Sequence, residues 1–233
     1  MEVRYRLQSL SEMFSDIENM EKVVVGVDLV DNLIGGIIPG HLHAILGESG
    51  SGKTWFCLKA INSMLKSNSS ARIGYVDFSA NIRSNNLNIM LSEKNFRNRI
   101  DFFQPKTLIE SIIFTTSLLK EIHYDMLIYD TIFGSPLQIL ETLKLGDRNW
   151  GYKIHLFLSN LRKIAKRHNL PILLTHSLFN NSGNFSSDKE FVQVEPFISL
   201  KFRLHRTDKE RKIDAFFFQQ YLGTEEILLY SKK

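Results

Sequence analysis

Hydrophobic and polar positions along this chain alternate between short apolar runs and stretches with helical spacing. Apolar runs predict strands at HAIL (43–46), RIGYVDF (72–78), RIDFF (99–103), DMLIYD (125–130) and PILLTHS (171–177). The sequence predicts a helix over 54–67, and an S/T-x-x-E capping box at Thr107 and Glu110 predicts a second helix from about 108 to 122. Apolar positions within 154–165 share one helical face. Strands that alternate with helices pair in parallel, so this order predicts an α/β fold with a mostly parallel central sheet and helices on both faces.

The two ends of the chain depart from this alternation. Three late runs, FISLKFRLHR (197–206), KIDAFFFQQY (212–221) and EEILLY (225–230), predict antiparallel C-terminal strands. Near the start, spacings of four and three predict a helix with one apolar face, formed by Val3, Leu7, Leu10, Phe14 and Ile17. That face either packs on this chain's own core or docks on a partner or a neighbouring subunit. We expect a helical extension over 1–24 and one domain over 25–233.

Composition narrows the class of protein. Hydrophobic residues make up 43% and charged residues 23% of the 233 residues, which is typical of a globular domain and not of a disordered chain. The single cysteine, Cys57, excludes an internal disulfide and a cysteine-based zinc site, and it fits a reducing cytoplasm. We find neither a signal-peptide pattern nor a long apolar span, so we expect a cytoplasmic protein with no membrane partner.

Positive charge is concentrated in one segment. Residues 145–206 contain ten Lys and Arg against four Asp and Glu, a net charge of +6, whereas the whole chain carries +4. Such a segment either faces a polyanion or is simply solvated.

The strongest chemical signal is GESGSGKT, residues 47–54, which matches G-x-x-x-x-G-K-[ST] between an apolar strand and a helix. Glycines in such a loop let backbone N–H groups converge on phosphate oxygens, and the following helix N-terminus adds positive potential. Lys53 would hold the outer phosphates, and Thr54 would offer its hydroxyl to Mg²⁺. The predicted ATP-binding residues are Gly47, Glu48, Ser49, Gly50, Ser51, Gly52, Lys53 and Thr54.

A magnesium-nucleotide site of this kind also needs a carboxylate at the end of a neighbouring strand. Asp130 follows the apolar run MLIY and is the candidate, holding Mg²⁺ through water beside Thr54. The alternative is that Asp130 only caps the following turn.

With these two motifs in place, the chain resembles the RecA/RadA recombinase superfamily, in particular its short archaeal RadB-like paralogues. GVDLVDNLIGGIIPG (26–40) is similar to the segment that leads into the family's P-loop, GYVDF to its next core strand, LIYD to its Walker B strand, and ILLTHS to the strand that usually ends Thr-Asn-Gln. The resemblance implies a RecA-like P-loop ATPase core over 25–233. It also implies ATP and Mg²⁺ as cofactors and a role in DNA recombination and repair.

In that superfamily, the loops after the Walker B strand and after Thr-Asn-Gln face DNA. The resemblance therefore implies DNA contacts from Arg148 and Trp150 in the first loop and from Lys189 in the second, with single-stranded DNA as the expected ligand. Lys201 and Arg203 alternate along the next predicted strand and so share one face, which either faces DNA or is solvated. The alternative for Trp150 is that it packs in the core. The implied protein partners are a main recombinase or another paralogue, and further copies of this chain.

Departures from the superfamily pattern bear on catalysis. Ser79 stands where the superfamily has the Glu that orients the attacking water, so hydrolysis is expected to be slow, with Asp77 as the local substitute base. Ser177 replaces the terminal Gln, and Ile17 follows Phe14 where the Phe-x-x-Ala polymerisation motif has Ala. Only 46 residues precede Gly47, so we expect no counterpart of the superfamily's N-terminal DNA-binding domain.

Three interpretations remain. The first is a weak Mg²⁺-dependent ATPase that binds DNA and assists a main recombinase. The second is a non-catalytic ATP-binding accessory subunit, and the third is a KaiC-like signalling ATPase without a nucleic-acid partner.

Overall fold

The computed structural model describes residues 19–78, 91, 93–118, 124–132, 150–178, 194–206, 210–217 and 220–228. The predicted N-terminal helix lies outside these residues, as do Ser79, Arg148 and Lys189.

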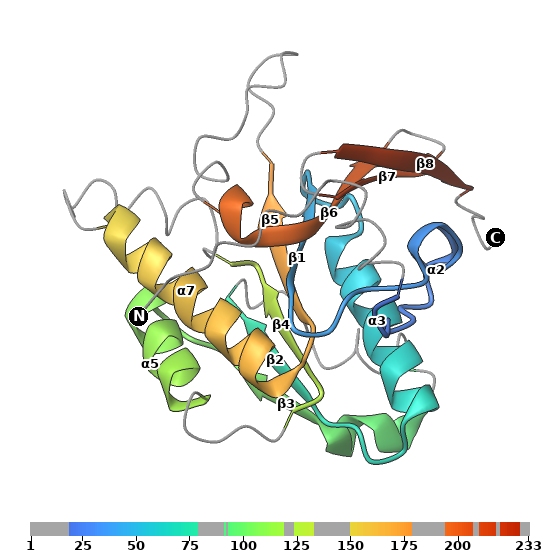
Figure 1. Ribbon diagram of the computed structural model, residues 1–233. Helices are drawn as coiled ribbons and strands as arrows, with labels where there is room; N and C mark the ends of the chain where they lie inside the picture. Colours follow the sequence, from blue (N-terminus) through green and yellow to red (C-terminus); the bar gives the residue numbers. More distant parts are fainter. Residues whose placement is uncertain are drawn as a thin grey trace, which may run out of the picture.

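Eight strands of the described residues form one sheet in the order β3-β2-β4-β5-β1-β6-β7-β8 (Figure 1). The parallel part consists of β1 (Leu42–Gly47), β2 (Ile73–Asp77), β3 (Ile100–Phe103), β4 (Met126–Asp130), β5 (Ile172–Ser177) and β6 (Ile198–Arg206). Every residue of β1, β2 and β4 is buried, which explains their continuous apolar runs. The predicted α/β fold with a mostly parallel sheet is therefore confirmed.

The C-terminal strands differ in part from the prediction. β6 runs parallel to β1, so only β7 (Glu210–Phe217) and β8 (Gln220–Leu228) are antiparallel to the strand that precedes them. The run 212–221, predicted as one strand, contributes to both β7 and β8. The sequence offers no Gly or Pro at this reversal, so the usual turn signal is missing.

Helices cover both faces of the sheet. α3 (Lys53–Ser67) packs on one face, where Phe56 and Ile61 join a buried cluster with Ile45 and Ile128. α5 (Leu108–Leu118) and α7 (Trp150–His168) lie on the other face, as Figure 1 shows, and Phe157 and Leu161 of α7 pack there. Two short 3₁₀ helices, Lys94–Arg99 and Glu195–Phe197, precede β3 and β6.

The segment before β1 contains α2 (Asp28–Ile34), a helix that the apolar pattern did not predict. The Asp31 carboxylate accepts hydrogen bonds from the backbone N–H groups of Val25, Gly26 and Val27, at 2.8, 2.7 and 3.1 Å. Gly35 ends the helix with a φ of 76°, a left-handed conformation that glycine adopts without strain. Asp31 therefore ties the chain that enters the domain to the helix that leads toward β1.

The start of α5 follows the predicted S/T-x-x-E pattern with one difference. The Glu110 N–H donates to Thr107 Oγ1 at 3.2 Å, but Glu110 Oε2 accepts from the N–H of Lys106 rather than of Thr107. Both contacts stabilise the helix start.

Within the described part of the chain, no helix is long and apolar enough to cross a membrane.

Candidate nucleotide site

The loop between β1 and α3 has the backbone shape of a phosphate cradle. Gly50 and Gly52 have φ values of 76° and 107°, in the region where residues with a Cβ are strained. A Cβ built on Gly47 would lie 2.3 Å from Ser51 Oγ and 2.6 Å from the Leu204 carbonyl oxygen. The glycines predicted from the motif are therefore required by the loop's own geometry.

Lys53 is the first residue of α3, and its side chain folds back into this loop. Its Nζ donates to the carbonyl oxygens of Gly47, at 2.9 Å, and Glu48, at 2.8 Å. Burial lowers the pKa of the Lys53 ammonium from its usual value, while the nearby Asp130 carboxylate acts in the opposite direction. The ammonium is thus held inside the loop that carries the phosphate-binding motif.

The Asp130 carboxylate lies at the end of β4 and receives three hydroxyl groups. Thr54 Oγ1 donates to its Oδ2 at 2.7 Å, the Tyr75 hydroxyl donates to the same oxygen at 2.6 Å, and Thr175 Oγ1 donates to Oδ1 at 2.5 Å. Burial first, and then the Asp130 charge, raise the pKa of Tyr75 well above its usual value, so its hydroxyl keeps its proton. The Asp130 side chain therefore faces the P-loop.

Asp77 ends β2 directly beside Asp130. The two residues are partners in the parallel register, and both are almost fully buried, at 1% and 2% exposure. Gln104 Nε2 donates to Asp77 Oδ2 at 3.4 Å. Two carboxylates thus lie at the carboxyl end of neighbouring strands, where ligands bind in open α/β sheets.

These side chains fit a magnesium-nucleotide complex. Mg²⁺ prefers oxygen ligands and keeps several waters, so one hydroxyl and one carboxylate suffice from the protein. Thr54 and Asp130 supply that pair, and Lys53 supplies a cation for phosphate oxygens. Among the described residues, no group of three or more His, Cys, Asp or Glu forms an alternative metal site.

The residues predicted to contact DNA are only partly described. Lys201 and Arg203 alternate with the buried Phe202 and Leu204 along β6, as the predicted strand requires. Lys201 Nζ bonds to Glu195 Oε1 at 2.6 Å, and Asp214 of β7 is the register partner of Arg203. Trp150 is the first residue of α7.

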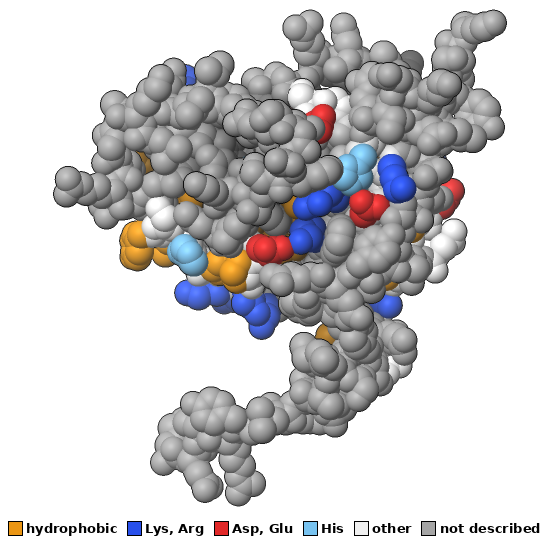
Figure 2. Space-filling model, turned by 90° about the horizontal axis from the view of Figure 1, so that it is seen from above, with side chains coloured by type: hydrophobic (Ala, Val, Ile, Leu, Met, Phe, Trp, Pro, Cys, Tyr) orange, Lys and Arg blue, Asp and Glu red, His pale blue; other side chains and the backbone are white. Residues whose placement is uncertain are grey.

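Basic and acidic side chains alternate on this side of the molecule. His205 Nε2 lies 2.9 Å from Asp214 Oδ2, and Lys201, on the same strand as His205, is paired with Glu195. At the centre of the view in Figure 2, the coloured side chains, which belong to the described residues, include blue, red and pale blue ones side by side. The surface around Lys201 and Arg203 on β6 therefore carries less net positive charge than the residues of β6 alone indicate.

Much of the positive segment instead lies at the far end of α7. Its last turn carries Lys166, Arg167 and His168, and Arg162 and Lys163 are exposed one turn earlier. Cations at a helix C-terminus are stabilised by the helix dipole. α7 ends just before β5 begins, so this basic cluster is at the edge of the sheet opposite the P-loop.

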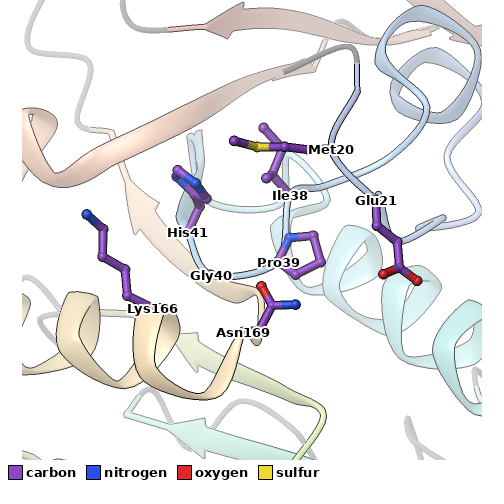
Figure 3. A pocket seen from close by; sticks show the side chains of 8 residues that line it. All are labelled: Met20, Glu21, Ile38, Pro39, Gly40, His41, Lys166 and Asn169. Atoms are coloured by element: carbon purple, nitrogen blue, oxygen red, sulfur yellow. The ribbon is translucent and has the colours of Figure 1, made fainter. Parts of the chain in front are cut away.

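A cavity of about 280 Å³ lies at that opposite edge (Figure 3). It is lined by Met20, Glu21, Ile38, Pro39, Gly40, His41, Lys166 and Asn169. His41 precedes β1, and His41 Nδ1 hydrogen-bonds with Ser199 Oγ at 2.7 Å. Burial, followed by the charges of Lys166 and Arg162, lowers the pKa of His41. The cavity contains no part of the P-loop, so it is separate from the nucleotide site.

Sequence reasoning identified Lys53, Thr54 and Asp130, and the structure brings them together. It did not identify Tyr75 or Thr175 as partners of Asp130. Tyr75 lies in the strand motif GYVDF and Thr175 in the strand motif ILLTHS. Their side chains lie on the same face of the sheet as Asp130, the face that α3 covers. The period-two alternation of strands was the available signal.

Comparisons with known proteins show what the sequence and the fold of this chain are similar to. No family model matches the chain. The DNA repair and recombination protein RadB of Thermoplasma volcanium is 26% identical over 177 residues, covering 75% of this chain and 74% of that protein. A crystal structure of the RadB recombinase aligns with a TM-score of 0.68 at 19% identity, covering 88% of this chain and 94% of that one. This structural likeness shows the fold.

Proposed function

We propose that this chain, which is RadB-like in sequence and RecA-like in fold, is an ATP-binding recombinase paralogue that acts in homologous recombination and DNA repair. It would bind DNA and assist a main recombinase or another paralogue, in the cytoplasm, with further copies of itself as additional partners.

One observation carries the nucleotide part of this proposal. The hydrogen bond from Thr54 to Asp130 joins the P-loop helix to the end of β4, beside the Lys53 ammonium. Lys53 would bind phosphate oxygens in place of its carbonyl contacts, and Thr54 and Asp130 would hold Mg²⁺, which would neutralise phosphate charge. The backbone N–H groups of Gly47 to Thr54 would bind the phosphates, and the α3 N-terminus would add positive potential.

We propose slow hydrolysis for this site. Asp77 is the register partner of Asp130 at the end of the neighbouring strand, and it would accept the proton of the attacking water. Its burial and its Gln104 contact restrict its movement. Turnover is therefore expected to be lower than in recombinases that have Glu at the position of Ser79.

A second candidate is a non-catalytic subunit for which ATP is a structural ligand. It is favoured by Ser177, which ends β5 as the register partner of Gly47 and offers only a short hydroxyl beside the P-loop. The N–H of the next residue, Leu178, donates to the Gly47 carbonyl oxygen at 3.0 Å. ATP would then stabilise the fold by mass action.

DNA binding is proposed for Arg148, Trp150, Lys189, Lys201 and Arg203. Phosphate contacts from the basic residues and stacking by Trp150 are the usual chemistry for single strands. Because Lys201 is paired with Glu195, its contact with a phosphate requires that this ion pair open.

ATP turnover with and without single-stranded DNA distinguishes these candidates. Turnover that DNA increases, and that Asp130→Asn abolishes, supports the ATPase. ATP binding without turnover supports the structural-ligand alternative. Turnover that Asp130→Asn leaves unchanged contradicts the proposed site, and ATP turnover without any DNA binding favours a signalling ATPase.

A further inference from the structure

We infer that Tyr75 and Thr175 are positioning residues that hold the Asp130 carboxylate in the orientation in which it supports Mg²⁺ at Thr54. This inference rests on the proposed nucleotide site and adds two residues to it.

The geometry distributes the donors over both carboxylate oxygens. Tyr75 donates to Oδ2 from β2, on one side of β4, and Thr175 donates to Oδ1 from β5, on the other side. Both donors are fully buried, at 0% exposure. Asp130 is therefore held from the two strands that flank it, and a rotation of its side chain would break both contacts.

Because Asp130 is buried, the loss of either hydrogen bond would be costly in free energy. Asp130 is only 2% exposed, so its carboxylate has little water to replace a lost donor. A hydroxyl such as that of Thr54 can point a lone pair at a metal while its O–H group donates a hydrogen bond to a carboxylate. The direction of that lone pair then depends on where Asp130 Oδ2 lies, and Tyr75 and Thr175 determine that position.

A purely structural role is the competing explanation. The Tyr75 ring also packs 5.3 Å from the ring of Phe102, centroid to centroid, so Tyr75 contributes to the core as well. The chain offers a matched control on the opposite face of β4. Tyr129 is equally buried, and its hydroxyl hydrogen-bonds with Thr115 Oγ1 at 2.9 Å, not with Asp130. Tyr129→Phe and Thr115→Val therefore remove the same groups without touching the Asp130 cluster.

The test is a Mg²⁺ titration of nucleotide affinity in the full chain, with a fluorescent ATP analogue and a parallel measurement in EDTA. Tyr75→Phe and Thr175→Val should each raise the Mg²⁺ concentration for half-maximal binding about tenfold, as is typical when partners of a metal ligand are lost. Affinity in EDTA should stay unchanged. Thr175→Ser, which keeps the hydroxyl, should restore the wild-type midpoint, and the two control variants should match the wild type.

Two results overturn the inference alone. In the first, Tyr75→Phe and Thr175→Val have the same Mg²⁺ midpoint as Tyr129→Phe and Thr115→Val. In the second, their affinity in EDTA falls as much as in Mg²⁺, which would indicate general damage to the loop. A wild-type protein that binds no nucleotide would instead overturn the proposed function, and the inference with it.

Discussion

Thr54 and Asp130, which are 76 positions apart in the sequence, are joined by a hydrogen bond of 2.7 Å between Thr54 Oγ1 and Asp130 Oδ2. Thr54 lies in the first turn of α3, and Asp130 is the last residue of β4. β5 separates β4 from the β1 strand that leads into α3. The contact therefore requires the sheet order as well as the two motifs, and it places a hydroxyl and a carboxylate where Mg²⁺ would need them.

The first prediction concerns the Thr54 hydroxyl. Thr54→Val keeps the side-chain shape but removes the oxygen, so ATP affinity in Mg²⁺ should fall by about tenfold. Affinity in EDTA should not change, because the phosphate cradle and Lys53 remain. Calorimetric titration of Thr54→Val and of the control Thr54→Ser, which retains the oxygen, measures these affinities. Wild-type affinity of Thr54→Val in Mg²⁺ would remove Thr54 from the metal site.

The second prediction concerns His43, which is fully buried on β1. Its Nε2 bonds to the Ile38 carbonyl oxygen at 2.8 Å, and burial lowers its pKa to about 3. The unfolded chain, with a pKa of about 6.5, takes up the proton first as the pH falls. The stability from neutral His43 is therefore complete above pH 6.5 and declines between pH 6.5 and 3.

This group alone should lower the free energy of unfolding by about 1.3 kcal/mol between pH 7 and 5.5. Urea unfolding at both pH values measures the change, and His43→Leu should show a decrease smaller by about that amount. An equal decrease in both proteins would mean that His43 is not the group responsible. The nearby His41 is present in both and cancels in the comparison.

The third prediction concerns Lys201. If its ammonium binds a DNA phosphate, Lys201→Ala should reduce the slope of log affinity against log salt by about one. Glu195→Gln removes the paired carboxylate and should strengthen binding. Fluorescence anisotropy with labelled single-stranded DNA measures both effects. Lys66→Ala, at the C-terminal end of α3, is the control and should leave the slope unchanged. The same slope in Lys201→Ala and wild type would place the DNA surface elsewhere.

The fourth prediction concerns turnover. Because Ser79 cannot act as a carboxylate base, Ser79→Glu should raise the steady-state ATPase rate. Ser79→Ala should leave the slow rate of the wild type unchanged, since no proton acceptor is lost. A wild-type rate that already falls strongly in Ser79→Ala would mean that Ser79 itself takes part in hydrolysis.

The central strands β1, β2 and β4 could be predicted from the sequence because they are buried on both faces, which favours continuous apolar runs such as MLIY. α2 was missed because it has only seven residues, too few for a helical period to stand out. The three backbone contacts of Asp31 that hold its start are not visible in a pattern of hydrophobicity. The β7–β8 reversal lacks Gly and Pro.

The candidate site was also predicted only in part. A motif with fixed spacing identified Lys53 and Thr54, and a strand end identified Asp130. The bonds from Tyr75 and Thr175 depend on which strands flank β4, and that order comes only from the three-dimensional arrangement. Likewise, the positive segment 145–206 gave a net charge but not its placement. Much of that charge belongs to the end of α7, and Lys201 is offset by Glu195.

The most direct test of the central claim is the equilibrium binding of Mg²⁺-ATP to the wild-type chain, to Lys53→Ala and to Lys66→Ala. Both variants remove a lysine of α3, but only Lys53 reaches into the P-loop. We predict saturable binding by the wild type and by Lys66→Ala, and no detectable binding by Lys53→Ala. Binding by Lys53→Ala at wild-type affinity would contradict the assignment of the phosphate site.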